Sequence, residues 1–425
     1  MQYPITAERT NLFAPNVHVA MAVLVKGVKG LEEMKKAILS ACLRNDILCS
    51  KIVLKENGEA FYEPISTPNQ TIISYDNRNH SNWISIVKEQ ESIPFDIFHG
   101  ELVRFFLLKE DMNTRLLIIA HHLAGDGISY TYLIEDIMLA LSNTGDLSPK
   151  PIELFHTKTL PKKYRLSLPM QLMIRYANQS WRKQGKVFDL ADYETIYNRY
   201  WEKRSTEIFL YSLKEEELSQ LIKRAKQCDV TINSILLTAM LKVYKEKADL
   251  GMAVSIRPQE YRGMANFASG IAIDYQYRTD KTFAENAKEV NCLVHDKLQD
   301  NKKKYFLLQF LDALEPSLID STYFAAFAGF ENKLANRFCK MFGYSGKPKD
   351  LSVTNLTKLD IPMEYGSFGI EDFWFVPPVI SNSKRLFGIA TLGNTMNITF
   401  HIEHTQELKS LKTYFDHVVK ELIDE

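Results

Sequence analysis

The chain contains little cysteine. Only five of its 425 residues are cysteines, they are scattered, and no two have the Cys-x-x-Cys spacing of a zinc ribbon. An odd number of isolated thiols argues against a disulfide framework and suits a reducing compartment, so we expect a cytoplasmic protein. The cysteines are Cys42, Cys49, Cys228, Cys292 and Cys339.

The chain also lacks net charge, because its 52 basic residues are balanced by 52 acidic ones. This balance argues against nucleic-acid binding driven by phosphate neutralisation. No apolar run is long enough to span a membrane. Residues 1–9 lack the basic and then apolar pattern of a signal peptide. We therefore expect no transmembrane segment, and any membrane contact would be peripheral.

The length and the 45% hydrophobic content are sufficient for two substantial cores. Strand and helix patterns alternate in residues 1–160 and again in residues 206–425, which predicts an α/β protein with two halves. Residues 161–205 follow a stretch with several prolines, and they show little of the apolar pattern that is typical of strands. We expect them to form a linker that carries one or two helices.

The most informative stretch is residues 121–127, His-His-Leu-Ala-Gly-Asp-Gly. An apolar run of strand length precedes it, and a helix is predicted from Ile128. Neighbouring side chains of a strand point to opposite faces, so only one of His121 and His122 can face a given cavity. This arrangement favours a single catalytic base over a two-histidine metal site. Two alternatives remain: Asp126 caps the helix, and either histidine is a hydrogen-bonded core residue.

Four further segments accompany this motif, in order from residue 94 to residue 356. They are Pro94-Phe95-Asp96-Ile97 with Gly100 and Leu102-Val103-Arg104, Thr231-Ile232-Asn233-Ser234-Ile235-Leu236, Ser255-Ile256-Arg257-Pro258 with Gly263 and Asn266, and Val353-Thr354-Asn355-Leu356.

Together with the His-His-three residues-Asp-Gly pattern, these segments resemble the CoA-dependent acyltransferase superfamily. Its members include chloramphenicol acetyltransferase, the condensation domains of nonribosomal peptide synthetases, alcohol acetyltransferases and polyketide-associated acyltransferases. The resemblance implies two chloramphenicol acetyltransferase-like α/β sandwich halves arranged as a V-shaped pseudo-dimer. The active site would lie in a tunnel between them, and because the chain contains both halves we expect a monomer.

The resemblance also assigns roles to residues. His122 would be the general base, with Asp126 and Gly127 completing the catalytic motif and His121 in support. Asp126 would be structural, held by a desolvated, bidentate pair with Arg257 from the second half.

An oxyanion that forms during the reaction needs hydrogen-bond donors. The candidates are the Gly127 backbone N–H and two tunnel residues, Thr354 and Asn355. Thr354 and Asn355 have an alternative role, as strand-end residues that satisfy backbone groups.

The implied function is a standalone acyltransferase that moves an acyl group from a thioester to a hydroxyl or amine. The thioester, acyl-CoA or a phosphopantetheine arm of an acyl or peptidyl carrier protein, is a co-substrate, and no permanently bound cofactor is expected. The acceptor would be a small molecule or a lipid. The alternatives are a non-catalytic condensation-like binding or scaffold protein, and a carrier-protein-dependent condensing enzyme that forms amide or ester bonds.

Two departures from the superfamily pattern stand out. Leu356-Thr357 occupies a place where relatives often carry Leu-Gly, and the Asp-Phe-Gly-Trp-Gly motif of plant acyltransferases is absent. No metal site is expected, because His401 and His404 are three residues apart on a predicted strand and face opposite ways. The basic stretch 301–304 is predicted as solvated surface, with contact to CoA phosphates or an acidic carrier protein as the alternative.

Overall fold

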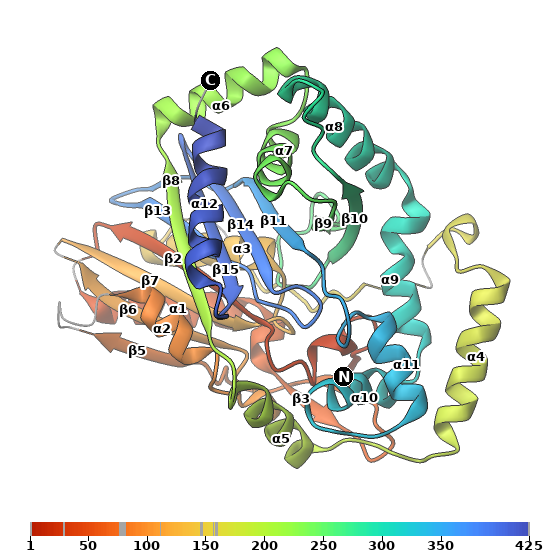
Figure 1. Cartoon of the computed structure of the whole chain (residues 1–425). Coiled ribbons are helices and arrows are strands. Elements are labelled where there is room, and N and C mark those ends of the chain that lie inside the picture. The colour runs from red at the N-terminus through yellow and green to blue at the C-terminus, as the bar shows by residue number, and fades with distance from the viewer. Residues whose placement is uncertain are drawn as a thin grey trace.

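The computed structural model describes residues 2–28, 30–75, 82–110, 112–144, 148–155, 157 and 160–423. Two six-stranded mixed sheets dominate the molecule and lie in different parts of it (Figure 1). A small antiparallel sheet of order β1-β4-β3 accompanies the first. No helix in the described ranges combines the length and apolarity needed to cross a membrane.

The first half carries the sheet of order β12-β13-β2-β7-β6-β5. Its central strands are almost wholly apolar and buried, as strands covered on both faces require. The elements of this half are β1 (Tyr3–Pro4), β2 (His18–Lys26), α1 (Leu31–Arg44), β3 (Ser50–Leu54), β4 (Ala60–Pro64), β5 (Thr71–Tyr75), α2 (Trp83–Gln90), β6 (Val103–Glu110), β7 (Asn113–His121) and α3 (Gly127–Ser142).

The predicted linker folds into two helices, as expected. Helix α4 (Leu168–Arg182) begins with a proline in its first turn, and the side chain of Asp189 caps α5 (Leu190–Trp201). Both helices pack apolar side chains into the core of the first half, among them Trp181 and Tyr193. The linker is therefore part of that core.

The second half carries the sheet of order β10-β9-β11-β14-β15-β8. Helices α6, α7, α8 and α12 bury their apolar faces against it in a separate core. The elements after the linker are β8 (Thr206–Leu213), α6 (Glu215–Cys228), α7 (Ile232–Tyr244), β9 (Ala248–Ser255), β10 (Ala268–Tyr275), α8 (Phe283–Gln299), α9 (Asn301–Ala313), α10 (Pro316–Phe327), α11 (Lys333–Met341), β11 (Leu351–Lys358), β12 (Glu364–Tyr365), β13 (Phe368–Val376), β14 (Arg385–Leu392), β15 (Thr395–Glu403) and α12 (Leu408–Ile423).

Two strands of the second segment, β12 and β13, lie in the first sheet. Strand β13 pairs antiparallel with β2, so that Phe373 is opposite Val23 and Phe375 opposite Met21. Helices α10 and α11 likewise place apolar residues in the first core. Residues 206–425 were predicted as one contiguous half, but the chain passes back into the first half before it completes the second sheet.

Candidate active site

The motif occupies the turn between β7 and α3. Strand β7 ends at His121, so His122 lies just beyond the strand that was predicted to include it. The His121 ring is buried, and its Nδ1 accepts the Leu123 N–H at 3.2 Å. Burial lowers the pKa of His121 to about 3, and the neighbouring His122 lowers it further. His121 is therefore a neutral core residue that shapes the turn.

His122 is half-buried and faces the second half of the chain. Its Nδ1 lies 3.2 Å from Nδ2 of Asn266, in the loop before β10. Burial lowers its pKa, while the Asp126 carboxylate and a hydrogen bond to the residue's own backbone carbonyl act in the opposite direction. Because the net shift is downward, the ring is neutral near pH 7 and retains a nitrogen lone pair for a proton.

Asp126 has both of the roles proposed for it. Its Oδ1 accepts the Ser129 N–H at 2.9 Å, which caps α3. The same oxygen accepts Nη2 of Arg257 at 2.8 Å, and both side chains are buried. Its Oδ2 accepts the Phe267 N–H at 2.9 Å. The pairing with Arg257 is confirmed, whereas the predicted bidentate geometry is wrong, because Oδ2 is taken by a backbone N–H.

Arg257 also donates to the Ser129 hydroxyl and to the backbone of its own loop. Nη1 donates to the Gly263 carbonyl and Nη2 to the Ala265 carbonyl, each at 2.8 Å. Ala265 also accepts the Asp126 N–H, at 3.3 Å. The guanidinium therefore joins the motif turn of the first half to the loop that carries Asn266.

Gly127 is closely packed against the second half of the chain. A Cβ at this position would lie 2.7 Å from Cδ2 of Leu356, closer than carbon atoms approach. Asn355, which precedes Leu356, donates to Oδ1 of Asn233 at 3.3 Å and accepts the Thr357 N–H at 2.8 Å. These contacts favour the alternative role for Asn355, in which it satisfies backbone groups where the strand ends. An oxyanion role for Thr354, Asn355 or the Gly127 N–H stays a prediction.

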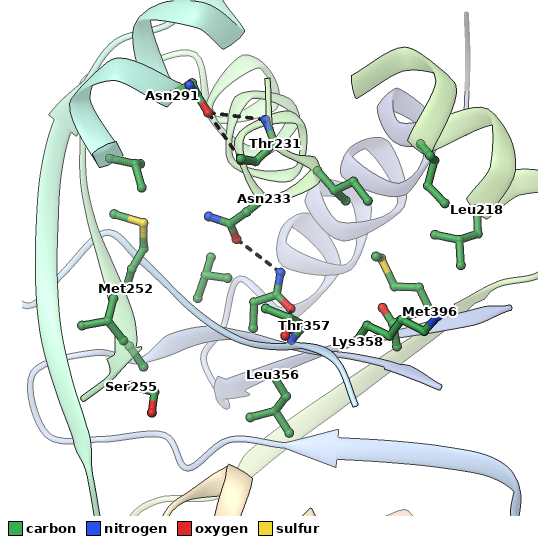
Figure 2. Close-up of a pocket in the computed structure, with 18 of the residues that line it drawn as sticks. Leu218, Thr231, Asn233, Met252, Ser255, Asn291, Leu356, Thr357, Lys358 and Met396 are labelled. Carbon is green, nitrogen blue, oxygen red and sulfur yellow. Dashed lines mark hydrogen bonds between the residues drawn. The ribbon is translucent and has the colours of Figure 1, made fainter. Parts of the chain in front are cut away.

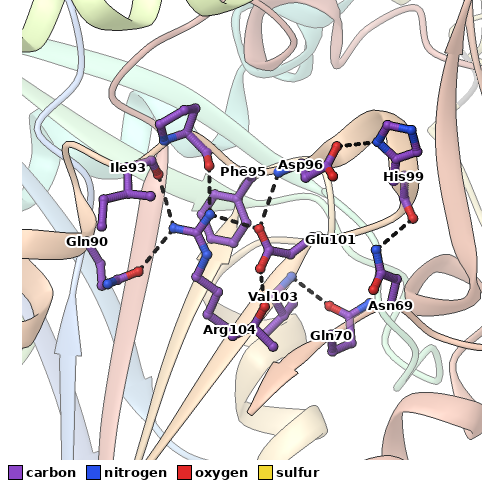
Figure 3. A network of polar contacts seen from close by, with 12 residues as sticks. Asn69, Gln70, Gln90, Ile93, Phe95, Asp96, His99, Glu101, Val103 and Arg104 are labelled. Atoms are coloured by element: carbon purple, nitrogen blue, oxygen red, sulfur yellow. Dashed lines mark hydrogen bonds and ion pairs between the residues drawn. The ribbon is translucent and has the colours of Figure 1, made fainter. Parts of the chain in front are cut away.

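The Pro94-to-Arg104 run forms a buried polar network behind the motif (Figure 3). Arg104 donates to the carbonyls of Ile93 (3.1 Å) and Pro94 (2.7 Å) and to the carboxylate of Glu101 (2.8 Å). Its guanidinium lies 4.2 Å from the centroid of the Phe95 ring. Burial alone would raise the pKa of Glu101, but these hydrogen bonds hold it below its usual value.

This network determines where His121 lies. The His121 N–H donates at 2.9 Å to the carbonyl of Leu102, which directly precedes β6. The Phe95 ring contacts the His121 ring edge-on, with 5.8 Å between centroids. The run is thus a structural support for the motif.

A second support was missed in the sequence. Tyr62 has one hydroxyl proton, yet its oxygen lies 2.6 Å from Oε2 of Glu8 and 2.8 Å from the Leu123 carbonyl. Burial raises the pKa of Glu8 to about 7. When Glu8 is protonated, it donates to Tyr62, which then donates to Leu123 in the motif. Nothing in the local sequence around Glu8 indicates this contact, because its partners lie far along the chain.

His401 holds the two halves together and carries no metal-site geometry. Its Nε2 lies 3.0 Å from Oε1 of Glu91, and its Nδ1 lies 2.7 Å from the Pro377 carbonyl. Across the described ranges, no three His, Cys, Asp or Glu side chains cluster as metal ligands.

A cavity of about 800 Å³ adjoins the motif from the side of the second half (Figure 2). Its lining includes Ile128, the second residue of α3, together with Asn233, Asn355 and Leu356. Leu356 is also the residue that packs against Gly127. The cavity therefore begins directly beside the motif turn.

The family model described as "Condensation domain" matches residues 13–338, which is well over half of the chain. This chain belongs to the condensation domain family. Bacitracin synthase 2 of Bacillus licheniformis is 31% identical over 157 residues, covering 34% of this chain and 6% of that protein. Tyrocidine synthase 2 of Brevibacillus parabrevis is 29% identical over 140 residues, covering 31% and 4%. The chain spans only a small part of the length of these relatives.

Solved structures share the fold over the full length of this condensation domain. Polyketide synthase associated protein 5 of Mycobacterium tuberculosis covers 100% of this chain and 98% of its own, with a TM-score of 0.65 and 14% identity. The first condensation domain of the CDA synthetase covers 100% and 97%, with a TM-score of 0.65 and 10% identity. The predicted architecture of two chloramphenicol acetyltransferase-like halves in a V is confirmed.

Proposed function

We propose that this condensation domain transfers an acyl group from a thioester to a hydroxyl or amine, with His122 as the general base. The observation that carries the proposal is the neutral, half-buried His122 ring at the junction of the two halves. A base whose pKa lies below neutrality is ready to accept a proton at physiological pH. The adjoining cavity has room for a substrate.

In the proposed reaction, the unprotonated ring nitrogen of His122 takes the proton from the acceptor as the acceptor oxygen or nitrogen bonds to the thioester carbonyl carbon. The C–S bond then breaks, and the imidazolium returns the proton to the leaving thiolate. The oxyanion formed in between would be stabilised by the Gly127 N–H, Thr354 or Asn355.

In this proposal Asp126 and Arg257 are positioning residues. They bind each other, the Ser129 hydroxyl and the backbone of the turn and the loop, and so hold the motif in place. Holding two substrates in line with a fixed base supplies much of the rate enhancement for an already activated thioester.

The donor is either acyl-CoA or a carrier-bound thioester. A second candidate function is therefore a condensing enzyme that joins two carrier-bound substrates. It is favoured by membership of the condensation domain family and by relatives that are peptide synthases. The two candidates share the same chemistry at His122 and differ in the thioester that they accept.

The test is release of free thiol from a panel of acyl-CoAs with pooled alcohols and amines, and separately from acylated carrier protein. His122→Ala is compared with the unaltered protein and with His404→Ala, a control at an exposed histidine whose side chain is remote from the motif. We expect acceptor-dependent thiol release that falls by about 10²–10⁴-fold in His122→Ala only.

Each outcome is informative. Release with acyl-CoA supports the free-standing acyltransferase, and release only with carrier protein supports the condensing enzyme. Equal release from His122→Ala and the unaltered protein refutes the role of the base. No release from either donor indicates a non-catalytic member of the family.

A further inference from the structure

The cavity beside the motif has an apolar floor and a polar rim (Figure 2). The floor residues are less than one-tenth exposed, and those at the rim are mostly exposed. The floor consists of Leu218, Met252, Ile271, Val294, Val353 and Met396. The rim includes Ser219, Thr231, His295, Lys358 and Asn394.

This division follows from the local sequence. Strands β9 and β10 turn alternate side chains toward the helices, which places Met252 and Ile271 in the core of the second half. Helix α8 is fixed over them because Oδ1 of Asn291 accepts the Ser234 hydroxyl (2.9 Å) and the Thr231 N–H (3.4 Å) at the start of α7. Three helices and a sheet thus enclose an apolar space that no side chain of the described residues fills.

The end of β11 opens this space toward the motif. Its pairing with β14 is regular up to Asn355 and resumes only at Lys358, with Thr357 at a φ of 62° between them. Asn355 and Asn233 hydrogen-bond across the entrance (Figure 2). Leu356 and Ile128 connect the entrance to the turn that carries His122.

We infer that this cavity binds an aliphatic chain of about ten or more carbon atoms that belongs to one of the two substrates. Ligand sites typically measure about 300–1,000 Å³, and this cavity is large enough for such a chain. The inference rests on the proposed acyl transfer. A ligand with an apolar chain and a polar end matches a deep apolar floor and a polar rim. The chain belongs to the acyl donor or to a lipid alcohol acceptor, and the experiment separates these sources.

The first arm measures kcat/KM for acetyl-, butanoyl-, octanoyl-, dodecanoyl- and hexadecanoyl-CoA with one fixed acceptor. The second arm holds acetyl-CoA fixed and compares butanol with dodecanol. Each methylene that enters an apolar site contributes up to about fourfold in transition-state binding. We expect kcat/KM to rise with chain length in one arm, by at least about tenfold between four and twelve carbons.

Val254→Trp is the informative variant. Val254 is half-buried, lines the cavity and packs against the core of the second half. An indole at this position fills the cavity that the chain would occupy. Ala272→Trp is the matched control, because Ile271 and Ile273 face the core and place Ala272 on the opposite face of the sheet. Thermal unfolding of both variants checks that they fold.

Val254→Trp should lower the ratio of long-chain to short-chain kcat/KM by about tenfold or more. Ala272→Trp should leave the ratio unchanged. Chain-length dependence in the acyl arm identifies the donor as the source, and dependence in the alcohol arm identifies the acceptor. The absence of any dependence, or a dependence that Val254→Trp does not alter, overturns the inference.

Direct binding separates this inference from the proposed function. Titration calorimetry of dodecanoyl-pantetheine and dodecanol with the whole protein needs no turnover. Binding that Val254→Trp weakens, in a protein that releases no thiol, supports the cavity and refutes the acyltransferase. Turnover with no chain-length dependence, together with no binding of either probe, supports the acyltransferase and refutes the chain-binding cavity.

Discussion

Nη2 of Arg257 lies 2.8 Å from Oδ1 of Asp126, and this contact joins the loop after β9 to the turn that presents His122. Both side chains are buried, and the hydrogen bonds around them are almost fully assigned. The geometry of the base therefore depends on an interaction between residues that are 131 positions apart in the sequence.

Asp126→Ala should destabilise the protein and abolish activity together. The substitution leaves a buried guanidinium without its carboxylate, which typically costs about 3–5 kcal/mol, and it also removes the cap of α3. Denaturant unfolding and the thiol-release assay measure the two effects. Full activity with native stability would contradict the structural role.

Asp126→Asn is the matched control for the two roles of this residue. Asparagine caps helices as well as aspartate does, so the cap survives while the charge is lost. The Asp126→Asn variant should therefore have an unfolding free energy about 1 kcal/mol higher than that of Asp126→Ala and still lower than that of the unaltered protein. If the unfolding free energy of Asp126→Asn equals that of the unaltered protein, the Asp126–Arg257 charge pair contributes nothing to stability.

Several features of the site could be predicted from sequence because they are local. The turn after a buried strand and the capped helix α3 follow from residue spacing and pattern. The Asp126–Arg257 pair came from the resemblance alone. Local reasoning could not show that Oδ2 of Asp126 would be taken by the Phe267 N–H, because that contact depends on how a distant loop folds.

Other features are not encoded locally. The residue pattern of β13 does not show that this strand pairs with β2 in the other half. The basic stretch 301–304 was predicted as surface, and Lys302 and Lys303 are exposed; the sequence reasoning did not show that the stretch forms the first turn of α9, capped by the side chain of Asp300. The raised pKa of Glu8 follows only from its burial against Tyr62. No residue spacing in the sequence indicates this contact.

The pH dependence of kcat/KM should report the lowered pKa of His122. Activity requires the neutral ring, so kcat/KM should be constant above the pKa and fall as the pH decreases through it. Because burial lowers this pKa, the midpoint of the acidic limb should lie below the ordinary histidine value of about 6.5. A profile from pH 4.5 to 8 measures it, and a midpoint above 6.5 would contradict the role of burial.

Glu8→Gln should change how stability depends on pH. The pKa of Glu8 is raised from 4.5 to about 7, so its protonated form stabilises the fold. That contribution is fully present below pH 4.5 and is lost as the pH rises through 7, with a total of about 3 kcal/mol. Glutamine donates to Tyr62 at every pH and should remove this loss.

Unfolding free energies of the unaltered protein, Glu8→Gln and Glu56→Gln at pH 5 and pH 8 test this prediction. Glu56 is exposed, so its substitution should leave the pH dependence unchanged. Glu8→Gln should be more stable than the unaltered protein at pH 8 and similar to it at pH 5. An unchanged pH dependence would show that Glu8 is ionised in the folded state.

Thr357→Gly should stabilise the protein. Thr357 has a φ of 62°, in the left-handed region, where a β-branched side chain is strained and glycine is not. Relief of strain should contribute about 1 kcal/mol, partly offset by the greater freedom of glycine in the unfolded chain.

Thr354→Gly is the control for this prediction, because Thr354 lies within β11, where glycine weakens a strand by roughly 0.5–1 kcal/mol. The two variants should therefore shift the unfolding midpoint in opposite directions. If Thr357→Gly instead lowers both stability and activity, the threonine side chain supports the entrance of the cavity, and its strain is retained for that reason.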